Sequence, residues 1–184
     1  RQFYDVHIVG SNHILKAVSR FAPKIKKIVL ASTALIYGQT PHPNENSAPN
    51  PLNDYAVSKL SMEWMAKLWF DRLPIVVTRP FNCIGVGQSD HFLVAKILHA
   101  FANKAPTIEL GNLQIERDFI DIRQAAQIYY ELALHGDASQ AYNIASGRSH
   151  AISDLIDRFE HLSNHTIRVQ HNPQFARAHD PIAI

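Results

Sequence analysis

Two short apolar segments, each preceded by a stretch with helical spacing, constrain the fold of this chain most strongly. Residues 27–32 and 75–79 are nearly continuous runs of Ile, Val and Leu, which is typical of parallel strands covered on both faces. Apolar residues recur at helical spacing over 11–21 and 54–72. This alternation predicts an α/β fold, a partial Rossmann-type doubly wound parallel sheet in which the two strands are adjacent.

The rest of the chain continues the alternation with weaker signals. Gly, Pro and Asn residues separate the predicted helices and strands. Residues 39–53 are rich in Pro and Asn and predict an exposed loop, which either covers a ligand or serves as a solvated connector. Helices are predicted at 92–102, 124–135 and 153–162, and strands at 107–110, 118–122, 141–144 and 167–169.

Composition excludes several classes of protein. At 184 residues and 46% hydrophobic, the chain can bury one core and a small second lobe. A formal charge of +2 without long Lys/Arg blocks gives no support for nucleic-acid binding. A single cysteine excludes an intrachain disulfide, and no apolar run approaches the roughly 18 residues of a membrane span. These features predict a cytoplasmic protein without a membrane partner.

Tyr55 and Lys59 are the strongest candidates for catalysis. Four residues apart on a helix, they lie on one face, where the ammonium can favour ionisation of the phenol and so form an acid–base pair. Thr33 follows the first predicted strand, at the sheet edge where open α/β folds bind ligands. The spacing alone also fits an amphipathic helix with a surface lysine.

Other reactive side chains favour simpler interpretations. His161 and His165 lie four residues apart, but a metal site needs a third ligand and no Cys or carboxylate cluster accompanies them, so we predict no metal. Cys83 stands alone at a strand end, where a cysteine is more often a small packed residue than a reactive thiol.

Taken together, the motifs resemble the extended short-chain dehydrogenase/reductase superfamily, within its NAD-dependent epimerase/dehydratase family. Order and spacing both fit, and the resemblance covers nearly the whole chain. The segments that carry it are 33–38, Tyr55 to Lys59, 79–88, 111–113, 117–122, 142–147 and 172–173, followed by Arg177 and Asp180.

The resemblance implies an enzyme with a nicotinamide cofactor, NAD or NADP, and a nucleotide-sugar substrate. The implied activity is reduction of a GDP-4-keto-6-deoxy hexose at C4, giving a GDP-D-rhamnose type product. Thr33, Tyr55 and Lys59 would be catalytic, with Tyr55 and Lys59 also contacting the cofactor. By the same resemblance, Pro80 and Phe81 would border the nicotinamide, while Thr33, Asn82, Asn112, Arg117 and Arg177 would contact the substrate.

Arginine suits the phosphate groups of such a substrate because its planar fork makes two parallel hydrogen bonds. Arg117 and Arg177 could equally form surface ion pairs with Asp118 and Asp180. The resemblance further implies a homodimer through the helices near 11–21 and 54–72. Trp64 and Trp69 would then serve the dimer contact, although ordinary core burial explains them as well.

Two further observations bear on the reaction. The resembled 4,6-dehydratases place an acidic pair directly after the catalytic hydroxyl residue, whereas this chain has Ala34 and Leu35 there, which cannot do acid–base work. A 4-keto reductase or a UDP-sugar 4-epimerase therefore stays open. Val86 and Gln124 depart from the family pattern, which usually has Pro and Asp there, and they weaken the substrate assignment more than the chemistry.

The glycine pattern suggests that a part of the enzyme is missing. The family begins with a strand and a Gly-x-x-Gly-x-x-Gly turn at the cofactor pyrophosphate, but the seven glycines here are scattered. We therefore expect the C-terminal part of a longer enzyme, with residues 1–90 completing the dinucleotide-binding domain and 91–184 forming mainly a substrate-binding lobe, from which some segments return to the sheet. A non-catalytic binding remnant of the fold is the alternative from another class.

Overall fold

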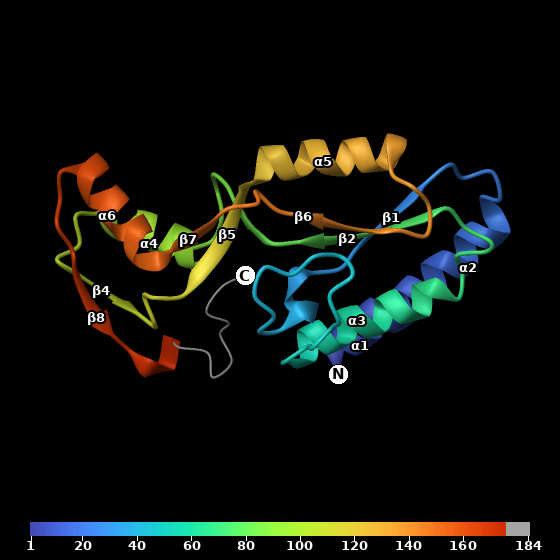
Figure 1. The fold of residues 1–184 in the computed structure, drawn as a ribbon, viewed down its shortest axis with the longest axis horizontal. Coiled ribbons are helices and arrows are strands. Elements are labelled where there is room, and N and C mark those ends of the chain that lie inside the picture. Colours follow the sequence, from blue (N-terminus) through green and yellow to red (C-terminus); the bar gives the residue numbers. More distant parts are fainter. Residues whose placement is uncertain (176–184) are drawn as a thin grey trace.

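A three-stranded parallel sheet forms the centre of the molecule, whose computed structural model describes residues 1–175 (Figure 1). Its strands are β1 (Ile28–Ala31), β2 (Ile75–Pro80) and β6 (Ala141–Ile144), in the order β1-β2-β6. Ile28 pairs with Ile75 and Val77 with Ala141, both in parallel register. The predicted parallel adjacency of the first two strands is confirmed, as is the α/β class.

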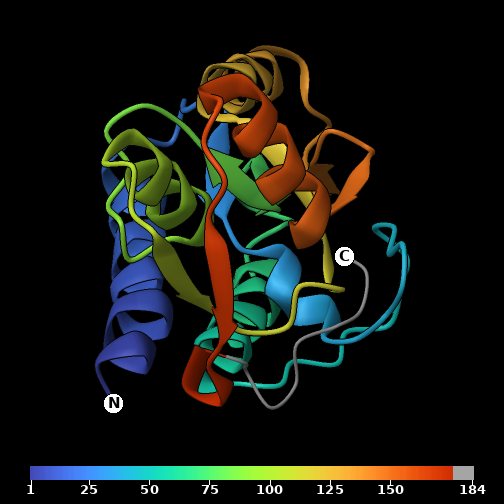
Figure 2. The same ribbon diagram turned by 90° about the vertical axis from the view of Figure 1, so that its left-hand side faces the viewer.

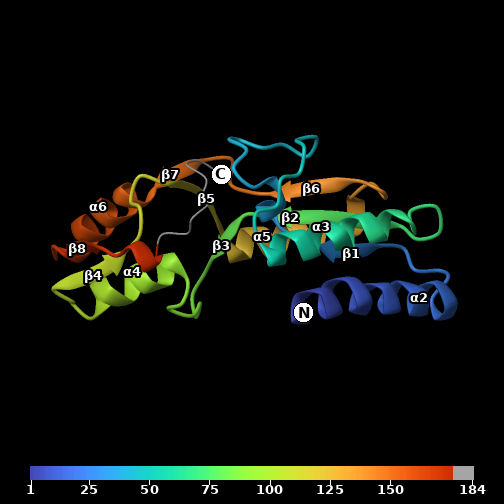
Figure 3. The same ribbon diagram turned by 90° about the horizontal axis from the view of Figure 1, so that it is seen from below.

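Helices cover both faces of this sheet (Figures 1 and 3). On one face lie α3 (Asp54–Lys67) and a helical segment composed of α1 (Gln2–Tyr4), the π-helix η1 (Asp5–Gly10) and α2 (Ser11–Phe21). Leu15 and Ala66 pack there against Ile75 and Val77. On the other face lies α5 (Ile122–His135), whose Ala125 packs with Ile144. This layering explains why the first half of β2, Ile75 to Val77, is apolar.

A second lobe is built from short strands and two helices, and Figure 2 views the molecule from this end. β3 (Asn82–Ile84) pairs in parallel with β5 (Glu116–Asp121), which pairs antiparallel with β7 (Ser149–Ala151), and β4 (Thr107–Leu110) pairs in parallel with β8 (Arg168–His171). Helices α4 (Leu93–Ala102) and α6 (Ile152–Ser163) bury Ile97, Phe101 and Ile156 in a separate core. β6 is a strand of the three-stranded sheet and α5 covers one face of it, although both elements follow residue 90.

A buried ion pair fastens the loop 39–53 to the sheet. Arg79 donates two hydrogen bonds to Glu63, from Nε at 3.1 Å and Nη2 at 2.8 Å. Its Nη1 donates to the Tyr37 hydroxyl at 2.8 Å and to the Glu45 carbonyl at 3.0 Å. Because Tyr37 donates in turn to Asn143 at 2.8 Å, one network joins β2, β6, α3 and the loop.

The loop begins at a glycine that no other residue could replace without strain. Gly38 follows the short 3-10 helix η2 (Ala34–Tyr37) and has a φ of 63°. A Cβ there would lie 2.0 Å from the Asn50 carbonyl oxygen, far inside van der Waals contact. The loop can therefore fold back closely on η2, where Asn50 N–H donates to the Ile36 carbonyl at 2.7 Å.

Some boundaries differ from the predictions. α3 ends at Lys67 and turns follow over residues 68–72, so the helix is shorter than the predicted 54–72. The strands β3 and β7 and the segment 2–10 were not predicted, because three-residue strands and an uncapped helix start have weak sequence signals. Among residues 1–175, no helix is long and apolar enough to cross a membrane.

Candidate functional site

Thr33 lies where the chain leaves β1 at the carboxyl end of the parallel sheet. Its backbone is extended, with φ −161° and ψ 148°, and its hydroxyl oxygen accepts a hydrogen bond from Leu35 N–H at 3.3 Å, capping η2. The side chain is buried, and its hydroxyl lies close enough to the Tyr55 phenol to lower the pKa of that phenol. Two residues that are far apart in sequence thus share one hydroxyl contact at the sheet edge.

Tyr55 and Lys59 lie in the first two turns of α3. The helix begins after Asn53, whose side-chain oxygen accepts from Ala56 N–H at 2.8 Å. Lys59 Nζ donates to the Ala31 carbonyl at 2.8 Å and lies 5.9 Å from the centre of the Tyr55 ring. The structure therefore brings Thr33, Tyr55 and Lys59 together around the end of β1.

The ionisation of Tyr55 differs from the expectation that Lys59 favours its phenolate. Burial raises the pKa of Tyr55 above its usual value near 10, and the nearby Thr33 hydroxyl opposes this only in part. Burial also lowers the pKa of Lys59. Tyr55 therefore carries its proton at neutral pH, as an ordinary tyrosine does, and can act as an acid.

Tyr129 was not predicted as a neighbour of the site. It lies on α5, where its hydroxyl accepts a hydrogen bond from Thr78 at 3.1 Å, near the end of β2. Burial raises its pKa, and the nearby Cys83 and Tyr55 raise it further. Burial likewise raises the pKa of the Cys83 thiol, which disfavours a reactive thiolate. The position of Tyr129 depends on how α5 covers the sheet, and the spacing of residues in the sequence does not reveal that packing.

The chain crosses from the sheet to the second lobe at Pro80, Phe81 and Asn82. Phe81 N–H donates to the Ile144 carbonyl at 2.9 Å, which holds this crossing against β6. Asn82 Nδ2 donates to the Asp118 carbonyl at 2.9 Å. The Asp118 carboxylate is buried and accepts from the backbone N–H groups of Ser146, Gly147 and Arg148 at 2.8, 2.7 and 3.1 Å. These bonds fix the crossing rigidly.

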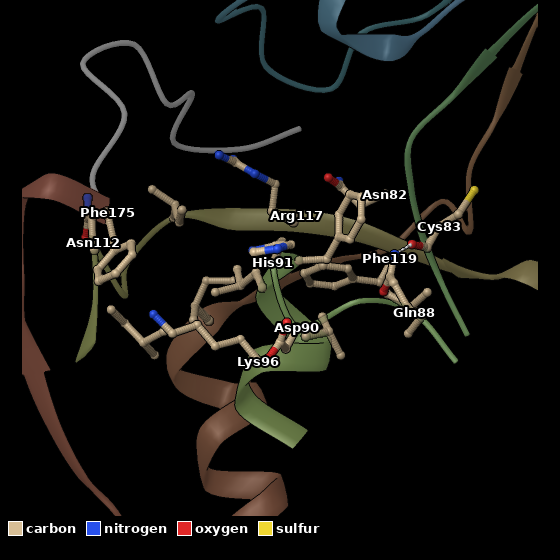
Figure 4. A pocket seen from close by; sticks show the side chains of 18 of the residues that line it. Asn82, Cys83, Gln88, Asp90, His91, Lys96, Asn112, Arg117, Phe119 and Phe175 are labelled. Atoms are coloured by element: carbon tan, nitrogen blue, oxygen red, sulfur yellow. Dashed lines mark hydrogen bonds between the residues drawn. The ribbon is translucent and has the colours of Figure 1, made fainter. Parts of the chain in front are cut away.

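Beyond this crossing lies a cleft of about 880 Å³, seen from close by in Figure 4. It is lined by four residues predicted as site residues, Phe81, Asn82, Asn112 and Arg117, together with Cys83, Ile84, Gln88, Asp90, His91, Phe92, Leu93, Val94, Lys96, Leu110, Gly111, Ile115, Phe119, Ile152, Gln174 and Phe175. Arg177, also predicted, lies outside the described residues. The volume suits a ligand of drug or nucleotide size.

Cationic and aromatic groups distinguish the lining. Arg117 is 9% exposed, and its Nη1 donates to the Glu116 carbonyl at 3.0 Å. Lys96 Nζ donates to the Glu109 carbonyl at 2.8 Å and lies 3.6 Å from the centre of the Phe175 ring. Asn112 accepts from Gln114 N–H at 2.9 Å, closing a turn at the rim. Sequence reasoning missed Lys96 and Phe175, since neither belongs to a motif and they meet only in the fold.

Metal binding has no support in the described part of the chain. Within residues 1–175, no group of three His, Cys, Asp or Glu side chains could hold a metal ion. His165 Nε2 instead hydrogen-bonds the Ala105 carbonyl at 2.9 Å, and its ring lies against Phe101.

Comparison with known proteins assigns the family. A family model described as GDP-mannose 4,6 dehydratase matches residues 1–181. The chain belongs to this family. The family lies within the extended short-chain dehydrogenase/reductase superfamily, as the sequence motifs predict.

Two curated relatives share about a third of the residues. GDP-6-deoxy-D-talose 4-dehydrogenase of Aggregatibacter actinomycetemcomitans is 34% identical over 182 residues, covering 98% of this chain and 62% of that protein. GDP-6-deoxy-D-mannose reductase of Pseudomonas aeruginosa is 32% identical over 182 residues, covering 92% of this chain and 59% of the enzyme. This chain therefore spans about 60% of the length of these relatives.

Solved structures agree with this assignment. A protein of Burkholderia cenocepacia J2315, provisionally described as an epimerase, is 41% identical with a TM-score of 0.93, over 98% of this chain and 60% of that one. RMD of Pseudomonas aeruginosa, solved with NADPH, is 29% identical with a TM-score of 0.85, over 91% of this chain and 62% of that one. The fold is thus that of the family over the described residues.

Proposed function

We propose that the gene product containing this chain is an NAD(P)-dependent nucleotide-sugar oxidoreductase that reduces a GDP-4-keto-6-deoxy hexose at C4. One observation carries the proposal: Thr33, Tyr55 and Lys59 meet at the carboxyl end of β1, where the phenol of Tyr55 is protonated at neutral pH. A protonated phenol beside a second hydroxyl is the arrangement needed to donate a proton to a carbonyl oxygen as it is reduced.

In this reaction each of the three side chains has a separate task. The reduced nicotinamide supplies the hydride when bound. Tyr55 donates its phenolic proton to the C4 oxygen, and Thr33, whose hydroxyl lies near that phenol, orients the same oxygen. Lys59 lies 5.9 Å from the Tyr55 ring, where its positive charge stabilises the phenolate that remains after proton transfer.

The residues at the sheet edge fit a nicotinamide nucleoside. An ammonium has three N–H groups, and within residues 1–175 the one hydrogen bond of Lys59 is to Ala31, which leaves donors for ribose hydroxyls. Pro80 is the last residue of β2, and Phe81, which follows it, lines the cleft. Residues 1–90 would complete the cofactor domain, and either NAD or NADP is compatible with them.

The cleft is the proposed substrate site, formed mainly by the lobe of residues 91–184. Arg117 would pair with the diphosphate, assisted by Arg177, while Asn82 and Asn112 would contact the sugar and the nucleotide. A bidentate guanidinium–phosphate contact is worth more than a neutral hydrogen bond, so phosphate recognition contributes much of the affinity.

Reduction of the C4 carbonyl can give either of two configurations at C4 of the product. The names of the two curated relatives contain 6-deoxy-D-talose and 6-deoxy-D-mannose, which are C4 epimers of one another. Their identities to this chain, 34% and 32%, are nearly equal. We favour the product of the GDP-D-rhamnose type, with GDP-6-deoxy-D-talose as the direct competitor.

A homodimer is the proposed assembly. Apolar side chains on the helices that face away from the sheet stay exposed: Ile14 on α2 is 61% exposed, and Trp64 and Leu68, on and just after α3, are 57% and 80% exposed. A second copy of this face would cover them. Trp64→Glu should shift the mass measured by light scattering from dimer to monomer, and an unchanged mass would exclude this face.

The activity is tested with the purified full gene product, NADPH or NADH, and GDP-4-keto-6-deoxy-D-mannose. Oxidation of the cofactor at 340 nm together with a 6-deoxyhexose product is expected, and proton NMR of the product distinguishes the rhamno from the talo configuration. Interconversion of a UDP-hexose at C4 without net cofactor consumption would replace the reductase with the epimerase. Binding of the nucleotide sugar without turnover of any kind would support a non-catalytic protein.

A further inference from the structure

The helical segment at the start of the chain is joined to the first turns of α3 by two hydrogen bonds. The Tyr4 hydroxyl donates to Asp54 Oδ1 at 3.0 Å, and His7 Nδ1 lies 2.8 Å from Ser58 Oγ. Tyr4 and His7 are three apart on one segment, and Asp54 and Ser58 are four apart on the other. Each pair therefore spans about one helical turn, and the two segments contact one another along that turn.

Tyr55 lies within this contact. The centre of its ring is 5.5 Å from that of His7 and 5.6 Å from that of Phe3, and both pairs meet edge to face, at 80° and 76°. Phe3 and His7 are themselves stacked, with 5.9 Å between ring centres. Edge-to-face contacts stabilise one ring orientation over others, so the direction of the Tyr55 phenol depends on these two rings.

The hydrogen bonds of Ser58 determine which nitrogen of His7 carries the proton. Ser58 Oγ donates its single hydrogen to the Tyr55 carbonyl at 2.7 Å. The same oxygen must therefore accept from His7, which requires a proton on His7 Nδ1. A chain of two hydrogen bonds, from His7 through Ser58 to Tyr55, thus accompanies the ring contact.

We propose that His7 is a positioning residue for Tyr55, acting through its Nδ1–H bond to Ser58 and its edge contact with the phenol ring. The proposal rests on the proposed function, in which Tyr55 is the proton donor. His7 belongs to the π-helix η1, and such widened turns are frequent at functional sites. A displaced phenol would donate poorly even if the substrate bound normally.

Partial burial keeps the His7 ring neutral. The titratable groups of α3 that act on it are Tyr55, through the ring contact, and Lys59, while Tyr4 and Asp54 hydrogen-bond each other at the neighbouring contact. Burial lowers the pKa of His7 below its usual 6.5, and the Lys59 ammonium lowers it further. His7 is therefore an uncharged donor at neutral pH, and a neutral amide could take its place.

The test compares four variants of the full gene product in steady-state kinetics. Asn places its amide nitrogen where His7 has Nδ1, so His7→Asn should keep kcat within about threefold, whereas His7→Leu should lose about tenfold or more with KM nearly unchanged. Ser58→Ala should resemble His7→Leu. Tyr4→Phe is the matched control, since it loses the neighbouring hydrogen bond but no contact with the Tyr55 ring, and its kcat should equal that of the wild type.

A second measurement does not depend on activity. Nitrogen-15 NMR of the histidine side chains should find the His7 proton on Nδ1, and Ser58→Ala should move it toward Nε2. A proton on Nε2 in the wild type, or wild-type kcat in His7→Leu, would overturn the positioning role. If the wild type reduced no GDP-4-keto sugar, the proposed function would fail on its own, and the tautomer would still decide how His7 and Tyr55 are arranged.

Discussion

The buried pair of Arg79 and Glu63 allows a quantitative prediction about stability. Their side chains are 10% and 3% exposed, and two hydrogen bonds join them. Burial alone would lower the pKa of Arg79, but its bonds with Glu63 and Tyr37 raise it, so the guanidinium stays charged. Glu63→Gln keeps the shape of the side chain, removes its charge and leaves that guanidinium without a counter-charge.

The expected cost follows from the remaining contacts. Removing one partner of a buried ion pair typically costs about 3–5 kcal/mol, because an uncompensated charge stays in the interior. Here Arg79 keeps hydrogen bonds to Tyr37 and to the Glu45 carbonyl. Glutamine can also still accept one hydrogen bond, so we expect Glu63→Gln to lower the free energy of unfolding by about 3 kcal/mol. This is a large part of a typical unfolding free energy of about 5–15 kcal/mol.

Urea unfolding of the full gene product, followed by circular dichroism, measures this cost. The matched control is Glu131→Gln, because Glu131 is exposed and contacts His135 at 3.8 Å, so its midpoint should stay at the wild-type value. Replacing both members, as Glu63→Leu with Arg79→Met, should recover much of the loss. A Glu63→Gln midpoint equal to that of Glu131→Gln would refute this reasoning.

Three other outcomes are expected. Asp118→Ala removes the acceptor of three backbone N–H groups and should cost about 3 kcal/mol, visible as faster hydrogen exchange at residues 146–148; unchanged exchange there would contradict it. Arg117→Ala should raise the KM for a nucleotide diphosphate sugar at least about tenfold, since charge-assisted hydrogen bonds are worth about 1.5–3 kcal/mol, and an unchanged KM would remove Arg117 from the substrate site. Because the pKa of His7 is lowered from 6.5 in the folded state, the unfolded state binds its proton first, and stability should fall as the pH drops below about 6.5 toward the folded pKa. The same decline in His7→Asn would show that another group causes it.

Local signals explain why much of the fold could be predicted from the sequence. β1 and the first half of β2 are apolar runs, α2 has clear helical periodicity, and α3 begins at an Asn53 cap, so each segment has a local signal for its conformation. Segment 2–10 has no side-chain cap and includes a π-helix, and its helical state depends on packing against α3. A contact of that kind is invisible in a linear sequence.

In the candidate site, too, motif residues could be predicted from the sequence, whereas burial and contacts between distant segments could not. Thr33, Tyr55 and Lys59 belong to motifs with fixed spacing, and the fold brings them together. Burial reverses the expected pKa shift of Tyr55, however, since desolvation depends on which atoms surround the phenol. The cleft combines residues from several distant segments, so its cation–ring contact between Lys96 and Phe175 emerges only from tertiary structure.

The role of Tyr55 as proton donor is the central claim, and Tyr55→Phe in the full gene product tests it most directly. This change removes one hydroxyl and keeps the ring between Phe3 and His7. With GDP-4-keto-6-deoxy-D-mannose as substrate, kcat should fall by about 10²–10⁴ while KM changes little, as for loss of a general acid. A kcat equal to that of the wild type would contradict the account.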